Sequence, residues 1–264
     1  MTRPVRAAFD IETVSPQLDD DEQPDFRDSQ HFELLAAAVA YEYPDGSRET
    51  AVHWRDGWGS TAELAVAEWI VDSLADVETV VTYNGTEFDM LHLVGRARIA
   101  GAAAGRREPF ERAEALVDRI DHVDLQPPAW TAFGDYTSLE GTLRAVGIDP
   151  TATDPTGFDH GVPRAAWPTT PDEPVESRDV ARLGEIYLDA VDAGGTVAGG
   201  SGGDGDADGG DDTVSDSDTD GDTADGSDTP AVDADELRAM LDHYARADVE
   251  YLFDLADARP FGGD

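Results

Sequence analysis

The run VRAAFDI at residues 5–11 decides the fold, because an apolar run of this length predicts a strand buried inside a sheet. Residues 34–43 and 49–54 form two further strand-like runs, and the cluster Pro-Asp-Gly-Ser at residues 44–47 separates them. Clusters of this composition favour tight turns. We therefore predict a buried first strand that is followed by an antiparallel hairpin.

Downstream of the hairpin, helix-like and strand-like segments alternate, which is typical of an α/β protein. The predicted helices begin near residue 60 and then span residues 90–100, 110–119, 137–146, 177–191 and 233–257. The predicted strands span residues 78–83 and 120–125. Three antiparallel strands followed by parallel ones predict a mixed central sheet flanked by helices, in one domain made of residues 1–193 and 231–264.

Local signals predict where some of these helices begin and end. The Ser/Thr-x-x-Glu pattern of a capping box occurs at residues 60–63 and again at residues 137–140. Gly101 and Gly105 are expected to break the helix that begins near residue 90, and Gly147 follows the helix of residues 137–146.

Residues 194–230 stand apart from the rest of the chain, with 11 Gly, 11 Asp and no Arg. A segment of this composition cannot bury enough apolar surface to offset its ordering entropy. We predict a disordered acidic insertion that serves as a solvated spacer. The alternative is a docking tail for a basic partner.

The charge of the chain is extreme: 264 residues carry 58 acidic and 18 basic side chains, all of the latter Arg, for a net charge of −40. Acidity without Lys resembles the composition of proteins from salt-accumulating halophiles, and we interpret it as adaptation to the solvent. Mimicry of nucleic acid or binding of a basic partner is the alternative, but the acids are spread over the whole sequence. At about 1 M salt the Debye length is only about 3 Å, so the charge does not exclude a nucleic-acid substrate.

The absence of cysteine excludes disulfides, thiolate zinc sites and a Cys nucleophile. No apolar window reaches the length of about 18 residues that a membrane span requires. The first ten residues contain no apolar core of a secretory signal. We therefore expect a cytoplasmic protein that has no contact with a membrane.

Two carboxylates are predicted at the end of the first strand. Asp10 and Glu12 are two residues apart, and strand residues with this spacing point to the same face. Carboxylates presented together on an apolar scaffold are costly unless they bind a cation. A solvated strand end is the alternative interpretation.

Two later segments supply further acids in positions that favour a function. Asp89 closes the segment YNGTEFD of residues 83–89, which follows a predicted strand. Tyr244 and Asp248 lie four residues apart in the last predicted helix and therefore share a face. Because leucines lie on or near that face, Asp248 is expected to point towards the core, where an acid needs a partner.

Together, FDIET (residues 9–13), YNGTEFD (residues 83–89) and YARAD (residues 244–248) resemble the three motifs of the DEDD superfamily of 3′–5′ exonucleases. The match is to the subclass with Tyr four residues before the last Asp. The chain resembles the proofreading exonuclease domain of family B DNA polymerases, and is closer in size and motif spacing to the small ribonuclease H-like proteins of the YprB type. The resemblance covers most of the chain outside residues 194–230 and implies a ribonuclease H-like fold.

The resemblance implies a two-metal enzyme that hydrolyses phosphodiester bonds at the 3′ ends of single-stranded DNA or RNA. Asp10 would bridge two Mg²⁺ or Mn²⁺ ions, Glu12 and Asp248 would complete one site, and Asp89 would hold the second ion through water. These ions prefer carboxylate and water oxygens, and a pair of them about 4 Å apart stabilises both the attacking and the leaving oxygen. Tyr244 would orient the attacking water.

Five other residues receive supporting or open roles. Thr13, Asn84 and Phe88 are expected to contact or support the substrate. His243 stands five residues before Asp248, where the other DEDD subclass has a general-base His, so the choice between Tyr244 and His243 stays open. Asp124 ends the predicted strand of residues 120–125 and either approaches the metals or serves as an ordinary strand-end acid.

Two alternatives to the exonuclease remain. The first is a non-catalytic ribonuclease H-like module that binds nucleic acid or a protein, but such a module is expected to lose at least one of the four acids, and all are present. The second is an endonuclease of the same fold. The sequence does not choose between DNA and RNA, because that choice depends on contacts to the 2′-OH, and it names no protein partner.

Overall fold

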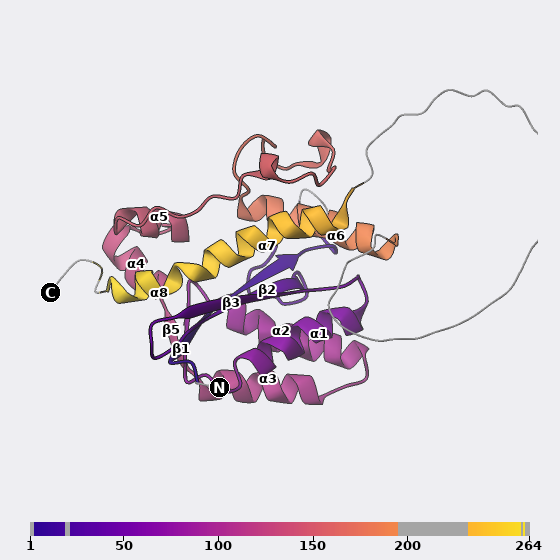
Figure 1. The fold of residues 1–264 in the computed structure, drawn as a ribbon. Coiled ribbons are helices and arrows are strands. Elements are labelled where there is room, and N and C mark those ends of the chain that lie inside the picture. Colours follow the sequence, from indigo (N-terminus) through magenta and orange to yellow (C-terminus); the bar gives the residue numbers. More distant parts are fainter. Residues whose placement is uncertain (1–2, 19–21, 195–231, 260, 262–264) are drawn as a thin grey trace, which may run out of the picture.

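The computed structural model describes residues 3–18, 22–194, 232–259 and 261, and it places a central sheet between two layers of helices (Figure 1). The strands are β1 (Arg6–Val14), β2 (Glu33–Glu42), β3 (Arg48–Trp54), β4 (Thr79–Thr82) and β5 (Asp121–Asp124). The α-helices are α1 (Ser60–Ser73), α2 (Asp89–Ala103), α3 (Glu108–Arg119), α4 (Gln126–Phe133), α5 (Leu139–Ala145), α6 (Ser177–Asp192), α7 (Ala234–Glu250) and α8 (Leu252–Asp257). The connection between α5 and α6 contains two 3₁₀ turns, Pro155–Gly157 and Arg164–Ala166.

The strand order in the sheet is β3-β2-β1-β4-β5. The pairs β1–β2 and β2–β3 are antiparallel, whereas β1–β4 and β4–β5 are parallel. Parallel neighbours need crossover connections, which α1 supplies before β4 and α2 with α3 supplies before β5. The predicted α/β fold class, a ribonuclease H-like mixed sheet flanked by helices, is confirmed.

The central strand β1 is longer than the run of residues 5–11 from which we predicted it. It pairs with β2 along its whole length, from Arg6 to Val14, but with β4 only as far as Ala8. Pairing with a ten-residue strand therefore extends β1 past the end of its apolar run. As a result, the second half of β1 has a neighbouring strand on one edge only.

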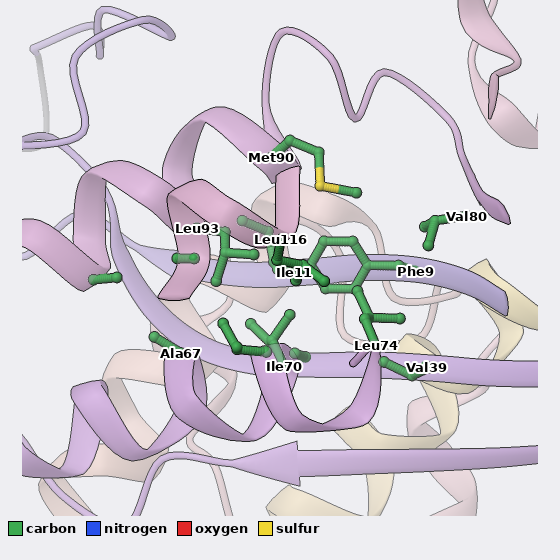
Figure 2. Close-up of a cluster of buried hydrophobic side chains, with 14 of the residues drawn as sticks. Phe9, Ile11, Val39, Ala67, Ile70, Leu74, Val80, Met90, Leu93 and Leu116 are labelled. Atoms are coloured by element: carbon green, nitrogen blue, oxygen red, sulfur yellow. The ribbon is translucent and has the colours of Figure 1, made fainter. Parts of the chain in front are cut away.

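Apolar side chains of β1 enter the core on both faces of the sheet. Figure 2 shows Phe9 and Ile11 among side chains of α1 and α2, including Ile70 and Leu93. Val14, on the opposite face, belongs to a second cluster that is built largely from α6 and α7. Helices thus cover both faces, and any polar group on β1 is expected to lie largely out of water.

The capping box predicted at residues 60–63 is wrong, although α1 does begin at Ser60. Gly59 is the N-cap residue, and no side chain caps this helix end. The Glu63 side chain instead turns inwards, where it accepts a hydrogen bond from the backbone N–H of Leu34 (3.0 Å) and pairs with Arg96 (2.6 and 2.8 Å). The Glu63 carboxylate therefore binds the buried Arg96 of α2 and does not cap the N-terminus of α1, the helix to which Glu63 belongs.

The capping box predicted at residues 137–140 is also wrong. Ser138 is the N-cap residue of α5, and its hydroxyl accepts a hydrogen bond from the backbone N–H of Gly141 (3.1 Å). The cap is therefore one residue later than the pattern indicated. Consequently, Glu140 takes no part in the predicted box and lies on the wall of a pocket.

Three helix boundaries also differ from the sequence prediction. Gly101 lies inside α2 rather than ending it, and the carbonyl oxygen of Arg106 approaches so closely that a Cβ at this position would come within 2.6 Å of it. The helix α4 was not predicted, although Pro127 and Pro128 stand at its start, where proline is tolerated. The last predicted helix is divided into α7 and α8 at Tyr251.

The predicted insertion of residues 194–230 lies outside the described residues except for Gly194. Its disorder and its role as a spacer therefore stay predictions. Within the described ranges, no helix has both the length and the apolar character that crossing a membrane requires.

We predict that Glu63→Gln lowers the free energy of unfolding by about 3–5 kcal/mol, because it removes the closer of two carboxylates from the buried Arg96 and leaves only Glu33, 3.9 Å away. The Glu63 and Arg96 side chains are only 3% and 4% exposed. The matched control is Glu68→Gln on the same helix, whose partner Arg106 is 48% exposed, and its cost should stay below about 1 kcal/mol. Urea denaturation measures both. Equal losses in the two variants would contradict the assignment.

Candidate functional site

Two carboxylates lie side by side on the central strand. Alternation along β1 places Asp10 and Glu12 on the same face as Ala8 and Val14, which is the face that α6, α7 and α8 cover. Glu12 is 9% exposed. The predicted pair therefore forms, but it lies inside the strand and beneath a helix rather than at a solvated strand end.

The helix α7 brings the third carboxylate. Ligand oxygens of Asp10, Glu12 and Asp248 all lie within 4.8 Å of one another. The sequence separates Asp248 from the other two by more than 230 residues, and only the packing of α7 on β1 and β2 unites them (Figure 1). This arrangement agrees with the prediction that Asp248 faces inwards from the last long helix.

Asp89 reaches the same site from the first turn of α2. Its carboxylate oxygen accepts a hydrogen bond from the backbone N–H of Ile11 (3.0 Å), and its side chain is buried. This N–H is available because β4 pairs with β1 only as far as Ala8. Asp89 therefore accepts a hydrogen bond from an N–H group that no strand pairs on this edge of β1. It is not part of the close group formed by Asp10, Glu12 and Asp248.

Burial raises the pKa of all four carboxyl groups, and the charges of neighbouring acids add to the rise. Burial raises the pKa of Asp10 well above its usual value, and the charge of Asp89 adds to this rise. Glu12 shows the same direction, with burial first and the charge of Asp248 second. Burial raises the pKa of Asp89 and of Asp248 to about 7, and Glu140 contributes to the rise at Asp248. The four groups therefore do not readily carry four negative charges together unless a cation is present.

The donor set fits a hard divalent cation. Glu12 Oε1 is buried and has no hydrogen-bond partner among the described residues. A buried carboxylate oxygen without a partner is costly, and a metal ion bound there would remove that cost. The oxygens of the three carboxylates are close enough together to bind one ion, and carboxylate oxygens are the ligands that Mg²⁺ and Mn²⁺ prefer.

Tyr244 stands one helical turn before Asp248, with its side chain buried. Its hydroxyl lies 3.1 Å from the Ser177 hydroxyl at the start of α6. Burial and the charge of Asp248 raise the pKa of Tyr244, so its hydroxyl keeps its proton. The hydroxyl is therefore a neutral group that can donate a hydrogen bond at this site.

His243 points elsewhere. It is exposed, and its Nδ1 lies 2.8 Å from the hydroxyl of Thr153 in the connection between α5 and α6. Phe158 packs near its ring. The structure thus brings Tyr244 to the acids and gives His243 partners in another segment.

Asp124 serves as an anchor for the loop after β4. Its carboxylate accepts backbone N–H hydrogen bonds from Asn84 (2.9 Å), Thr86 (3.0 Å) and Gln126 (3.1 Å). Asn84 has a φ of +73°, a left-handed conformation that Asn tolerates better than most residues. These contacts favour the second of the two roles considered for Asp124, because its oxygens already have donors.

The two remaining predicted substrate contacts lie on the other side of the sheet. Phe88 packs edge-on against Phe32 and His92, near the exposed Phe26. Alternation along β1 places Thr13 on the face of Ile11, opposite Asp10 and Glu12. Their contacts with a substrate, like that of Asn84, stay predictions.

A pocket of about 760 Å³ opens beside Tyr244 and Asp248. Its other walls come from α5, from residues 150–153 and from residues 173–178. The sequence analysis assigned no site role to Ser177 or to Glu140, both of which line it. Glu140 fitted the capping pattern, and neither residue has a fixed spacing from the three motifs, so no signal in the sequence marked them.

No family model and no curated protein matches this chain. Similar solved structures include a zinc-ion-bound complex of E. coli exonuclease I with single-stranded DNA, at 15% identity and a TM-score of 0.34, over 70% of this chain and 40% of that chain. A complex of E. coli exonuclease I with a dA16 oligonucleotide aligns at 15% identity and a TM-score of 0.32, with the same coverage. The chain thus spans about 40% of the length of exonuclease I. A likeness this weak decides nothing about activity, and the fold class follows from the sheet itself.

We predict that metal-free wild-type protein loses stability as the pH rises from about 4 to about 7, because the folded state holds protons on Asp89 and Asp248 that the unfolded state has already released. Asp248→Asn removes one such group. In EDTA at pH 8 its free energy of unfolding should therefore be about 1–3 kcal/mol higher than that of wild type. The gain should vanish near pH 4.

Denaturant melts across the pH range measure this difference, with the exposed Asp118→Asn as the control. Mn²⁺ should raise the stability of wild type at pH 8 and raise that of Asp248→Asn much less. If Asp248→Asn were less stable than wild type at pH 8 in EDTA, burial of the Asp248 charge would not be destabilising as we infer.

Proposed function

We propose that this protein is a divalent-metal-dependent 3′–5′ exonuclease of the DEDD type that hydrolyses single-stranded DNA or RNA. The observation that supports it most is the convergence of Asp10, Glu12 and Asp248, with an unpartnered buried oxygen on Glu12, beside a pocket. The motif resemblance assigns the same three residues to a metal centre, and it adds Asp89.

Two Mg²⁺ or Mn²⁺ ions, when bound, would supply a hydroxide nucleophile and stabilise the leaving 3′ oxygen. Asp10, Glu12 and Asp248 would hold the ions directly, and Asp89 would act from the edge of the group. Asp89 is fixed for this role by the backbone N–H of Ile11. Because burial disfavours free charge on these acids, they are primed to exchange protons for cations.

The protonated hydroxyl of Tyr244 would orient the attacking water. Its position is set by Ser177 on one side and by the rigid turn of α7 that also carries Asp248. His243 is engaged with Thr153, which favours Tyr244 for this role. The protein belongs, on this proposal, to the tyrosine-containing subclass.

The pocket supports a small or single-stranded substrate. Its volume of about 760 Å³ falls in the range of about 300–1,000 Å³ in which proteins hold small ligands. A nucleotide unit at a chain end fits such a space. The choice between DNA and RNA rests on contacts to the 2′-OH, so both sugars belong in the assay.

We predict that the wild-type protein shortens 5′-labelled single strands from the 3′ end in the presence of Mn²⁺, and that Asp10→Asn lowers the rate at least about 1,000-fold. Asp10→Asn should remain folded, since removing a charge relieves repulsion among the four acids. A gel time course in molar KCl, with DNA and RNA in parallel, measures the rates.

The pattern of products separates the proposal from its two alternatives. A strand with a blocked 3′ end should resist an exonuclease, whereas an endonuclease would still cut it internally. If wild type and Asp10→Asn both leave every strand intact while Mn²⁺ binds neither, the metal-dependent nuclease fails and the non-catalytic binding module takes its place.

We predict that Tyr244→Phe lowers kcat about 10- to 100-fold with little change in KM, because it removes the hydroxyl that positions water. His243→Ala should keep kcat within about threefold of wild type, since its partner Thr153 lies in another segment. Steady-state kinetics on one oligonucleotide compare the two neighbours directly. The opposite ranking would place this chain in the histidine-containing subclass.

A further inference from the structure

Most arginines of this protein are bound by a neighbouring oxygen atom. Sixteen of the 18 arginines contact a carboxylate or a backbone carbonyl. Only Arg98 and Arg144 have neither kind of partner among the described residues. In a chain with 58 acidic side chains, an arginine with neither a carboxylate nor a carbonyl partner needs an explanation.

Arg144 remains unpaired although a carboxylate is close in sequence. Glu140 lies four residues earlier on the same short helix, the spacing at which opposite charges commonly pair. No ion pair forms between Glu140 and Arg144 within the described structure. The charge of Glu140 acts on Asp248, whose pKa it raises in addition to the effect of burial. The guanidinium of Arg144 is therefore left exposed and free to bind another anion.

Its position connects Arg144 to the site already described. Arg144 lines the same pocket of about 760 Å³ as Tyr244 and Asp248. The other arginine that lines the pocket, Arg178, pairs with Glu176 at 2.9 Å. Arg98, by contrast, lies on α2 and lines neither this pocket nor the shallower one beside α8.

The helix that carries Arg144 is held firmly against the sheet. Tyr83, at the end of β4, donates its hydroxyl to the carbonyl of Thr137 (2.6 Å) and lies 2.9 Å from the hydroxyl of Thr142. Thr142 and Leu143 are buried. Arg144 therefore lines the pocket from a helix whose position is fixed by these contacts.

We propose that Arg144 binds a backbone phosphate of the substrate strand, next to the phosphate that is hydrolysed. An arginine presents a planar fork of N–H donors that matches two phosphate oxygens, and phosphate contacts fix the register of a nucleic-acid strand without reading its sequence. This inference rests on the proposed nuclease function and adds a substrate-binding residue outside the three motifs.

The three glutamates that line the pocket do not prevent Arg144 from binding a phosphate. Glu176 is occupied by Arg178 and by the first turn of α6. Glu140 acts on Asp248, whose pKa its charge raises, and Glu173 lies in the segment that precedes α6, away from α5 in the sequence. Among these carboxylates, the single unpaired guanidinium of Arg144 offers one binding position for a phosphate. A strand bound there through one phosphate would be held in one register.

The test uses single strands that each carry one methylphosphonate, which replaces a charged phosphate oxygen with a methyl group, at successive positions from the 3′ end. Wild type should lose about tenfold in kcat/KM at one position. Arg144→Ala should lose about tenfold on the unmodified strand, mainly through KM, and lose little more at that position. Arg98→Ala, the matched control, should behave like wild type.

The outcomes separate this inference from the proposed function. If wild type cleaves strands and Arg144→Ala matches Arg98→Ala, the inference falls and the nuclease stands. The inference also falls if Arg144→Ala still shows the full loss at the position where wild type is sensitive. If wild type cleaves nothing, fluorescence anisotropy with the same strands decides: weaker binding by Arg144→Ala than by Arg98→Ala supports the phosphate contact, and equal binding overturns it.

Discussion

Asp10 and Glu12 stand on a strand that helices cover on both faces, so their negative charge has little access to water. The attraction between a carboxylate and water is lost on burial, and no arginine lies among the partners of these two groups in the described part of the chain. Either protons or metal ions must then compensate the charge. The rest of the site follows from this requirement, because the groups that surround the pair add further acids rather than bases.

The open edge of the central strand determines how the other groups arrive. Since β4 stops pairing with β1 at Ala8, the N–H of Ile11 needs another acceptor, and Asp89 supplies it. The loop that delivers Asp89 is fixed in turn by Asp124 at the end of β5. Adjacent parallel strands that end at the same edge of the sheet thus build the site, as is common in α/β proteins.

Net charge and local charge have different consequences in this molecule. A charge of −40 describes the whole chain and affects its solubility and its long-range attraction for partners. Binding at the site depends on a few groups within a few ångströms. Most arginines pair with a neighbouring carboxylate, so the unpaired Arg144 on the pocket wall differs from its surroundings more than a cation on an ordinary surface would.

The sequence by itself determined the fold class and the order of the strands and of every helix except α4 and the separate α8, because alternation of apolar residues records which faces are buried. It also determined which acids share a face within one element, such as Asp10 with Glu12, since spacing along a strand or helix fixes direction. Short capping patterns were less informative. At residue 60 the predicted box does not form because Glu63 pairs with the buried Arg96, and at residue 137 the hydroxyl of the next residue, Ser138, caps the helix.

Only the tertiary structure decided which elements meet. The approach of Asp248 to Asp10, the separation of His243 from Tyr244, and the places of Glu140 and Arg144 on the pocket wall all depend on how α5 and α7 pack on the sheet. Contacts between residues far apart in the chain leave no local pattern, because they are selected by the fit of whole surfaces rather than by the residues beside them.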